Sequence, residues 1–223
     1  MRKVNAAKST GEVFSEIYAT GRWGEPYSSG PGSSGRVAAA YADYVRELLR
    51  TTGARRAVDI GCGDFGVAAQ FVDALESYHG LDVVAAMIDR NTAHHGGPGI
   101  NFEVLDASTG VLPPADICFV RQVLQHLSNQ QIAKILDRCA AYPMVVVTEH
   151  WPASEAQSRP NCDKSHGADT RLDRGSWVDI TADPFRCHPV EEVLRVQPEH
   201  HLYQAGETIR THLWRPTQRD STA

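Results

Sequence analysis

The residues best suited to chemistry are three glycines and an aspartate in the stretch RAVDIGCGDFG, which covers residues 56–66. Gly61, Gly63 and Gly66 follow a short apolar run, and their spacing allows a tight turn and a close approach of the backbone to a ligand. A pyrophosphate bound at such a loop gives the nearby Asp59 no obvious task. A ligand with an ammonium or sulfonium group would make Asp59 its counter-ion. This stretch alone does not decide between the two.

Two further aspartates stand at the ends of predicted strands. Asp82 ends YHGLD, where a carboxylate can accept hydrogen bonds from both ribose hydroxyls of either kind of cofactor. Asp106 ends NFEVLD, where it is suited to accept a hydrogen bond from an adenine amino group. A third acid at this point favours S-adenosylmethionine over a dinucleotide.

The elements that must position these residues alternate along the chain. Apolar runs predict five strands, at residues 56–60, 78–82, 101–106, 115–120 and 143–150. The MVVVT run in the last of them is apolar on both faces, as a central parallel strand should be. Strands that alternate with helices indicate a parallel sheet with right-handed crossovers. The predicted fold class is therefore α/β, with a doubly wound, Rossmann-like sheet that is mostly parallel.

Apolar periodicity predicts three helices. One starts at Gly66, so that its amino end faces the ligand, and its apolar positions are Val67, Phe71, Val72 and Leu75. A second starts at Ser128 with Gln131 completing a capping box, and its apolar positions are Ile132, Ile135, Leu136 and Cys139. A third precedes the first strand, is capped by Ser33 or Ser34, and is apolar at Val37, Tyr41, Tyr44, Val45, Leu48 and Leu49.

Three segments depart from this alternation. Residues 201–215 predict two antiparallel strands joined at Ala205-Gly206, a hairpin that closes the sheet. The polar stretch 151–185 is too long for an ordinary connection, and such loops are usually functional or disordered. The SSGPGSSG run has the composition of a flexible linker, but the aromatic residues before it are more than a linker needs. We therefore expect an N-terminal lid segment, residues 1–36, ahead of one domain at 37–216.

Four motifs occur in order along the chain: VDIGCG, GLD, VLDA and ADICFVRQVLQHLS. Together with the closing hairpin they resemble class I S-adenosylmethionine-dependent methyltransferases, and the resemblance covers residues 38–215. Phe65 stands where many members carry a third glycine, and Gly66 comes one place late. The resemblance implies S-adenosylmethionine as cofactor, with contacts from Asp59, Gly61, Gly63, Asp82, Met87, Asp106, Ala107 and Arg121.

The front segment RWGEPYSSGPGSSG resembles a W-G…S-G-x-G-S element that precedes the core in a group of bacterial methyltransferases. This narrower resemblance implies a lid that folds over the cofactor. Trp23 and Ser29 are the lid residues to which it assigns cofactor contacts.

Candidates for the acceptor side follow the fourth and fifth strands. Glu149 and His150 end the fifth strand, and a carboxylate beside a neutral imidazole can orient a polar acceptor and take its proton. His126, in the LQHL turn, is either a third catalytic residue or a hydrogen-bonded structural histidine. Arg121 either holds a carboxylate of the cofactor or substrate, or is a solvated surface residue.

The polar loop NCDKSHGADTRLDRGS, residues 161–176, comes after the fifth strand. We expect this loop to recognise the acceptor through Asp163, His166 and Arg171. The alternative is a solvated loop without a binding role.

Composition and charge limit the classes of partner. The 223 residues carry a formal net charge of −5, which leaves no broad basic face for nucleic acid. Five cysteines without a C-x-x-C spacing fit a reducing compartment, and without an apolar leader or long apolar run we expect a cytoplasmic protein that does not enter a membrane. The pairs His94-His95 and His200-His201 are adjacent, so neither forms a metal site by itself, and we expect no metal.

The sequence thus predicts methyl transfer to nitrogen or oxygen of a small molecule, with secondary metabolism as the context. Three alternatives stay open: methylation of a macromolecule, an NAD(P)-dependent oxidoreductase, and a methyltransferase-like binding protein without catalysis. The acceptor, the methylated atom and the oligomeric state, a homodimer included, are not specified by the sequence.

Overall fold

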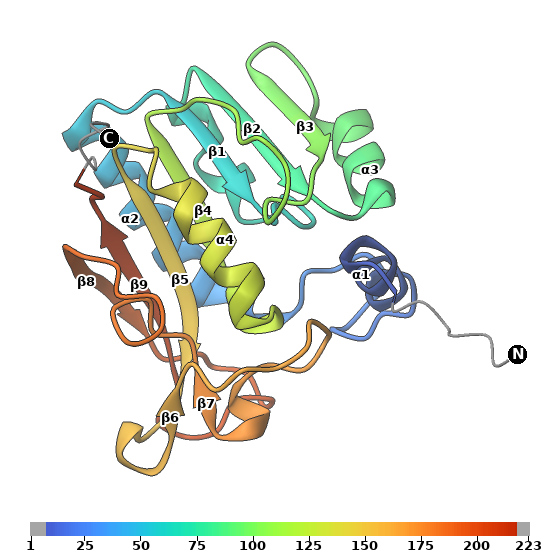
Figure 1. The fold of residues 1–223 in the computed structure, drawn as a ribbon. Helices are drawn as coiled ribbons and strands as arrows, with labels where there is room; N and C mark the ends of the chain where they lie inside the picture. The colour runs from blue at the N-terminus through green and yellow to red at the C-terminus, as the bar shows by residue number, and fades with distance from the viewer. Residues whose placement is uncertain (1–7, 218–223) are drawn as a thin grey trace, which may run out of the picture.

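Seven strands of the computed structural model, which describes residues 8–217, form one mixed sheet (Figure 1). The strand order is β3-β2-β1-β4-β5-β9-β8. The first five strands in this order are parallel, and β9 runs antiparallel to both of its neighbours. Their bounds are Ile100–Val104 (β3), Ser77–Asp82 (β2), Arg56–Ile60 (β1), Ile117–Arg121 (β4), Val145–Trp151 (β5), Thr208–Trp214 (β9) and Val190–Val196 (β8). The predicted fold class is confirmed.

Helices cover both faces of the sheet. In Figure 1, α4 lies in front of the sheet and α2 behind it, while α1 lies beyond the edge at which the parallel strands end. The four α-helices are Thr10–Ala19 (α1), Gly35–Thr52 (α2), Ala85–His95 (α3) and Asn129–Cys139 (α4). Shorter elements are the 3₁₀ turns Pro31–Ser33 (η1), Ala68–Gln70 (η2), Val72–Ala74 (η3), Leu124–His126 (η4), Glu155–Gln157 (η5) and Leu172–Arg174 (η6), and the paired strands Arg159–Pro160 (β6) and Ser176–Trp177 (β7).

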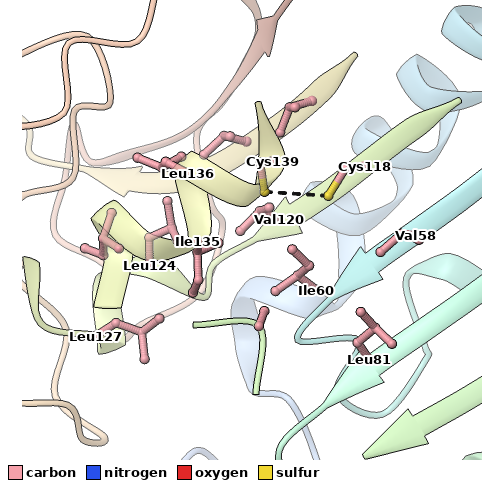
Figure 2. Close-up of a cluster of buried hydrophobic side chains, with 14 of the residues drawn as sticks. Val58, Ile60, Leu81, Cys118, Val120, Leu124, Leu127, Ile135, Leu136 and Cys139 are labelled. Atoms are coloured by element: carbon pink, nitrogen blue, oxygen red, sulfur yellow. Dashed lines mark hydrogen bonds between the residues drawn. The ribbon is translucent and has the colours of Figure 1, made fainter. Parts of the chain in front are cut away.

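Two apolar clusters fill the space between the sheet and its covering layers. Alternate residues of the central strands face opposite sides, so that Cys118 and Val120 pack with α4 whereas Ile117 and Phe119 pack with α2. Figure 2 shows the first cluster, in which the Cys118 and Cys139 sulfurs lie 3.9 Å apart. Strands that are buried on both faces account for the continuous apolar runs in the sequence.

The start of α4 follows the predicted capping box. The Ser128 hydroxyl accepts a hydrogen bond from the Gln131 backbone, and the Gln131 side chain accepts one from the Ser128 backbone. At the start of α2, Ser34 is the N-cap residue, but its hydroxyl donates to the Pro31 carbonyl instead of capping the helix. Of the two serines predicted to cap this helix, Ser34 therefore occupies the N-cap position but does not make the capping hydrogen bond.

The prediction of an α-helix from Gly66 was wrong. Residues 68–74 form the two short 3₁₀ turns η2 and η3. The buried positions in this segment are Phe65, Ala68 and Phe71, which repeat every three residues. This period matches the three residues per turn of a 3₁₀-helix, in which side chains at i and i+3 lie on the same side. Within the described residues, the glycine loop is therefore not followed directly by an α-helix.

The prediction of a C-terminal antiparallel hairpin was correct, but the position predicted for its first strand was wrong. The strand that pairs with β9 is β8, at residues 190–196, and residues 197–207 form the connection between them. The sequence of β8, VEEVLRV, is polar because this strand lies at the edge of the sheet, with Glu191, Glu192 and Arg195 at its surface or partly exposed. An edge strand of this kind gives a weak apolar signal.

The N-terminal segment and the polar stretch after β5 are both structured in the part of the chain that the structure describes. Phe14, Ile17 and Tyr18 of α1 are buried in the same apolar cluster as α4. In the polar stretch, Arg171 is 1% exposed and donates hydrogen bonds to the carbonyls of Cys162 and Leu127 and to the Asn129 side chain. Among residues 8–217, no helix is both long enough and apolar enough to cross a membrane.

Candidate functional site

One cavity of about 650 Å³ opens at the edge where the parallel strands end. Its walls come from the loops after β1, β2, β3 and β4, from the end of β5, and from three covering segments. These covering segments are residues 10–33, 168–173 and 202–207. The carboxyl edge of a doubly wound sheet is the usual place for a ligand.

The glycine loop approaches the end of β2 through backbone hydrogen bonds. The Gly61 nitrogen donates to the Leu81 carbonyl at 2.7 Å, and the Gly63 nitrogen donates to Asp82 Oδ2 at 3.1 Å. Both glycines have positive φ angles, 70° and 53°. A Cβ atom on Gly61 would lie 2.4 Å from Val123 Cγ2, and one on Gly63 would lie 2.2 Å from Ser29 Oγ. Only glycine fits either position.

Asp82 holds the turn while it faces the cavity. Its second oxygen, Oδ1, accepts a hydrogen bond from the Val84 nitrogen at 3.0 Å. Burial raises the pKa of Asp82 above its ordinary value, and the two backbone amides oppose that shift. Each carboxylate oxygen has capacity for one more hydrogen bond, so Asp82 can also accept the hydroxyls of a ribose.

Asp59 lines the cavity as a buried carboxyl group. Tyr78 donates its hydroxyl proton to Asp59 Oδ2 at 2.7 Å. Burial raises the pKa of Asp59 to about 7, and the Tyr78 hydroxyl and the Arg121 guanidinium act in the opposite direction. A cationic ligand beside Asp59 would therefore stabilise its ionised form.

Some of the residues predicted to contact the cofactor line the cavity, and others do not. Asp106 and Ala107 line the cavity, and Asp106 Oδ1 accepts a hydrogen bond from the Ser108 nitrogen at 2.8 Å. Met87 is fully buried in the apolar cluster under α3 and is not on the wall. Gly63 is not on the wall either, because Ser29 Oγ and the Tyr18 hydroxyl stand over it.

The N-terminal segment is fastened to the glycine loop. The Ser29 nitrogen donates to Asp64 Oδ2 at 2.8 Å, and the Asp64 nitrogen donates to Ser29 Oγ at 2.9 Å. Trp23 donates from its indole nitrogen to the Ala168 carbonyl at 3.1 Å, and its ring contacts His126 in a tilted arrangement, with ring centroids 4.8 Å apart. The segment therefore joins the glycine loop to the polar loop after β5.

Arg121 is the positive charge at the centre of this arrangement. Its guanidinium donates to the Gly32 carbonyl and to Ser33 Oγ, and lies 5.1 Å from the centroid of the Tyr41 ring. Within residues 8–217, Arg121 Nε and the Tyr41 hydroxyl are buried without a hydrogen-bond partner. Both residues line the cavity, and these buried atoms have unused hydrogen-bonding capacity.

Two histidines from neighbouring strand ends reach the same cavity. His150 Nε2 lies 3.1 Å from Glu207 Oε2, and the His150 ring lies 4.9 Å from the Tyr203 ring. His126 receives a hydrogen bond at Nε2 from Gln125 Nε2 at 3.4 Å, and burial lowers the pKa of His126 to about 4. His126 is therefore neutral at neutral pH, in contact with both Trp23 and Gln125.

Part of the chain matches a known protein family. Residues 57–142 match the family model described as "Methyltransferase domain". This match covers less than half of the chain. No curated protein sequence matches the chain.

Solved structures share the fold of this chain at low sequence identity. The N-methyltransferase NodS from Bradyrhizobium japonicum WM9, in complex with S-adenosyl-L-homocysteine, has a TM-score of 0.65 at 16% identity, over 95% of this chain and 100% of its own. The magnesium protoporphyrin IX methyltransferase ChlM from Synechocystis PCC 6803, with bound S-adenosylmethionine, has a TM-score of 0.56 at 14% identity, over 95% and 100%. The N-terminal domain of EvdMO1, with bound S-adenosylhomocysteine, has a TM-score of 0.56 at 14% identity, over 87% and 88%.

The domain match and the shared fold confirm the resemblance to class I S-adenosylmethionine-dependent methyltransferases, together with the enzyme class and cofactor that it implies. The roles of individual residues are not tested by these comparisons. They depend on where the structure places each side chain.

The structure separates the predicted pair Glu149 and His150. Neighbouring residues of a strand point to opposite faces, and only His150 is on the cavity wall. Glu149 is 2% exposed and accepts hydrogen bonds from the Leu124 nitrogen at 2.9 Å and the Gln125 nitrogen at 3.1 Å. Burial raises the pKa of Glu149 to about 8. We therefore interpret Glu149 as a structural acceptor for the η4 turn instead of a catalytic group.

This interpretation predicts that Glu149→Ala lowers the free energy of unfolding by about 2–4 kcal/mol, because two buried amides lose their acceptor. Glu149→Gln should cost less, since the side chain keeps one acceptor and resembles the protonated acid. Urea unfolding measures both changes. If Glu149→Gln instead abolishes turnover while stability and cofactor affinity are unchanged, Glu149 has a catalytic role.

The three residues predicted to recognise the acceptor are likewise not on the cavity wall. Arg171 is buried among carbonyls, and Asp163 Oδ1 accepts hydrogen bonds from the Asn129 nitrogen at 2.7 Å and the Lys164 nitrogen at 2.9 Å. His166 lies in the same loop, half-buried and away from the wall. The part of this loop that reaches the cavity is residues 168–173, without Arg171. Arg171 and Asp163 thus shape the loop, and its neighbouring residues face the ligand space.

Sequence reasoning missed Glu207 and Tyr203, which both line the cavity. Because β9 runs antiparallel to β5, the amino end of β9 lies beside the carboxyl end of β5. The residue that precedes β9 is therefore brought to the ligand edge of the sheet. The predicted turn at Ala205-Gly206 already placed Glu207 at the start of the last strand, so the antiparallel pairing of that strand with the fifth is the signal that could have identified it.

Proposed function

We propose that this chain transfers the methyl group of S-adenosylmethionine to a nitrogen or oxygen atom of a small molecule. The observation that carries the proposal is a single cavity with two chemically different ends. Asp59, Asp82 and Asp106 stand on the side of β1, β2 and β3, and His150, Glu207 and Tyr203 stand on the side of β5 and β9. One cavity can therefore accommodate a nucleoside cofactor and an acceptor next to each other.

The residues present fit the proposed cofactor. Gly61 leaves space that a side chain would fill, Asp82 can accept ribose hydroxyls, and Asp59 offers a carboxyl group to a positive charge. The buried, unpartnered Nε of Arg121 is suited to a carboxylate. When bound, S-adenosylmethionine supplies a methyl group that is already activated on a sulfonium, so the protein has to align the acceptor and exclude water.

A small acceptor is supported by the size and cover of the cavity. Its volume of about 650 Å³ lies within the range for small-molecule pockets. Residues 10–33 and 168–173 cover it, and the formal net charge of −5 does not favour nucleic acid. ChlM is described as a magnesium protoporphyrin IX methyltransferase, and the EvdMO1 domain was also crystallised in the presence of D-fucose.

The N-terminal segment, residues 1–36, of which residues 1–7 lie outside the described part of the chain, is proposed to act as a lid over the cofactor. The reciprocal hydrogen bonds between Ser29 and Asp64 and the contact of the Trp23 and His126 rings support this role. A lid held by these contacts would exclude water from the space next to the glycine loop.

A direct test measures cofactor binding and turnover with the full chain. We expect calorimetry to detect S-adenosylhomocysteine binding without NAD(P) binding, and a screen of amines, guanidines, phenols and sugars to give S-adenosylhomocysteine from S-adenosylmethionine. Binding of NAD(P) alone would support an oxidoreductase. Cofactor binding without turnover of any acceptor would support a binding protein.

A further inference from the structure

The acceptor end of the cavity contains an oriented histidine–glutamate pair. His150 ends β5 and Glu207 directly precedes β9, and their side chains are only 10% and 9% exposed. Glu207 Oε2 accepts from His150 Nε2 at 3.1 Å and from the Gln204 nitrogen at 2.9 Å. Because Nε2 of His150 donates to the carboxylate, its lone pair is on Nδ1. Among the described residues, His150 Nδ1 has no hydrogen-bond partner.

Two carboxylates place negative charge near this pair. Glu207 and Asp173 both line the cavity, and both act electrostatically on His150. Two cations also line the cavity: Arg22 is paired with Asp169 at 3.6 Å, and Arg121 is held by Gly32 and Ser33 of the N-terminal segment. A carboxylate, phosphate or phenolate acceptor next to His150 would meet the like charge of Glu207. An ammonium group would meet an opposite charge there, with the aromatic side chain of Tyr203 beside it.

A buried, unpartnered acceptor atom belongs to Gln125, another residue of the cavity lining. Gln125 is 5% exposed, and its Oε1 atom has no hydrogen-bond partner within residues 8–217. Its amide nitrogen is already directed to Gln122 and His126. A ligand N–H donor would satisfy Gln125 Oε1, whereas a carboxylate would not.

We propose that the methyl acceptor is a primary or secondary amine, that His150 removes its proton, and that Glu207 is the positioning residue for His150. This inference rests on the proposed function and names the substrate class of the same site. Negative charge, an aromatic face and an unpartnered oxygen together select a cationic donor of hydrogen bonds.

The chemical steps balance without a further reagent. An ammonium group has no lone pair, so His150 Nδ1 first accepts one proton, and Glu207 stabilises the resulting imidazolium. The amine nitrogen then forms a bond to the methyl carbon, the sulfur–carbon bond breaks, and the electron pair stays on sulfur as a thioether. The positive charge moves from sulfur to the methylated nitrogen, and the imidazolium returns its proton to solvent when the product leaves.

Matched acceptors test the substrate class. With the full chain and saturating S-adenosylmethionine, we would compare benzylamine, benzyl alcohol and benzoate, and the corresponding hexyl compounds, by formation of S-adenosylhomocysteine. Turnover with an amine should exceed that with its alcohol and carboxylate by at least about tenfold. In parallel, the amines should raise the melting temperature of the S-adenosylhomocysteine-bound protein more than the other compounds do.

Two matched variants test Glu207. Glu207→Gln should lower kcat for the amine about 10- to 100-fold and remove the selective thermal stabilisation by amines, with the calorimetric affinity for S-adenosylmethionine unchanged. Glu103→Gln is the control, because Glu103 also lies 3.1 Å from a histidine, His79, but away from the cavity. The double variant with His150→Asn should be no slower than His150→Asn alone, since Glu207 acts through His150.

Preference for an alcohol or a carboxylate in either assay would overturn the amine proposal. So would the absence of any amine preference in both assays while S-adenosylhomocysteine still binds, and this outcome leaves the proposed function intact. Absence of cofactor binding in calorimetry would instead contradict the proposed function itself.

Discussion

Asp82→Ala is expected to weaken S-adenosylmethionine binding by about 1.5–3 kcal/mol, or roughly 10- to 150-fold, which is the loss of hydrogen bonds to a charged acceptor. The variant would lose the proposed ribose contacts. It would also release the Gly63 nitrogen, which Asp82 Oδ2 holds at 3.1 Å. Isothermal titration calorimetry measures the change in affinity directly.

Two variants separate these contributions. Asp82→Asn keeps one acceptor oxygen and should lose less affinity than Asp82→Ala. Asp89→Ala, on the exposed side of α3 and away from the cavity, should bind the cofactor like the unmodified protein. Unchanged affinity for Asp82→Ala would remove the ribose assignment of this residue.

The sheet and one helix were predictable because their signals are local. Val145, Val146 and Val147 are buried on both faces of β5, which is why this run is continuously apolar. The capping box of α4 depends on two residues only three positions apart, and both of its hydrogen bonds are present. Elements of this kind are specified by neighbouring residues, whatever the rest of the chain does.

The parts that could not be predicted depend on contacts between distant residues. The 68–74 segment is buried every third residue against the sheet, so packing selected 3₁₀ turns over the α-helix that propensity favours. Glu207 reaches His150 across 57 positions, and the antiparallel pairing of β9 with β5 brings the two together. The pairing of Glu149 with His150 could have been excluded in advance from side-chain alternation in a strand.

The affinity for S-adenosylmethionine is expected to fall by up to about tenfold for each pH unit below 7, which amounts to about 50-fold between pH 7 and pH 5. Burial raises the pKa of Asp59 to about 7, although the Tyr78 hydroxyl and Arg121 oppose the shift, and the Asp82 carboxylate adds to it. In the free protein Asp59 is therefore protonated below that pH. The positive charge of the cofactor favours ionised Asp59, so binding at acid pH must release a proton. Above pH 7 Asp59 is already ionised, and the affinity should reach a plateau.

Calorimetry from pH 5 to pH 8 tests this dependence, and repeating it at pH 6 in buffers of different ionisation enthalpy measures the released proton directly. Asp59→Asn is the matched control: its affinity should be weak and nearly independent of pH, because the amide does not titrate. S-adenosylhomocysteine, which lacks the sulfonium, should show a shallower slope than S-adenosylmethionine with the unmodified protein. If the affinity of Asp59→Asn depends on pH as steeply as that of the unmodified protein, the titration belongs to another group in the cavity. Asp59 would then not have the counter-ion role that its position beside the glycine loop indicates.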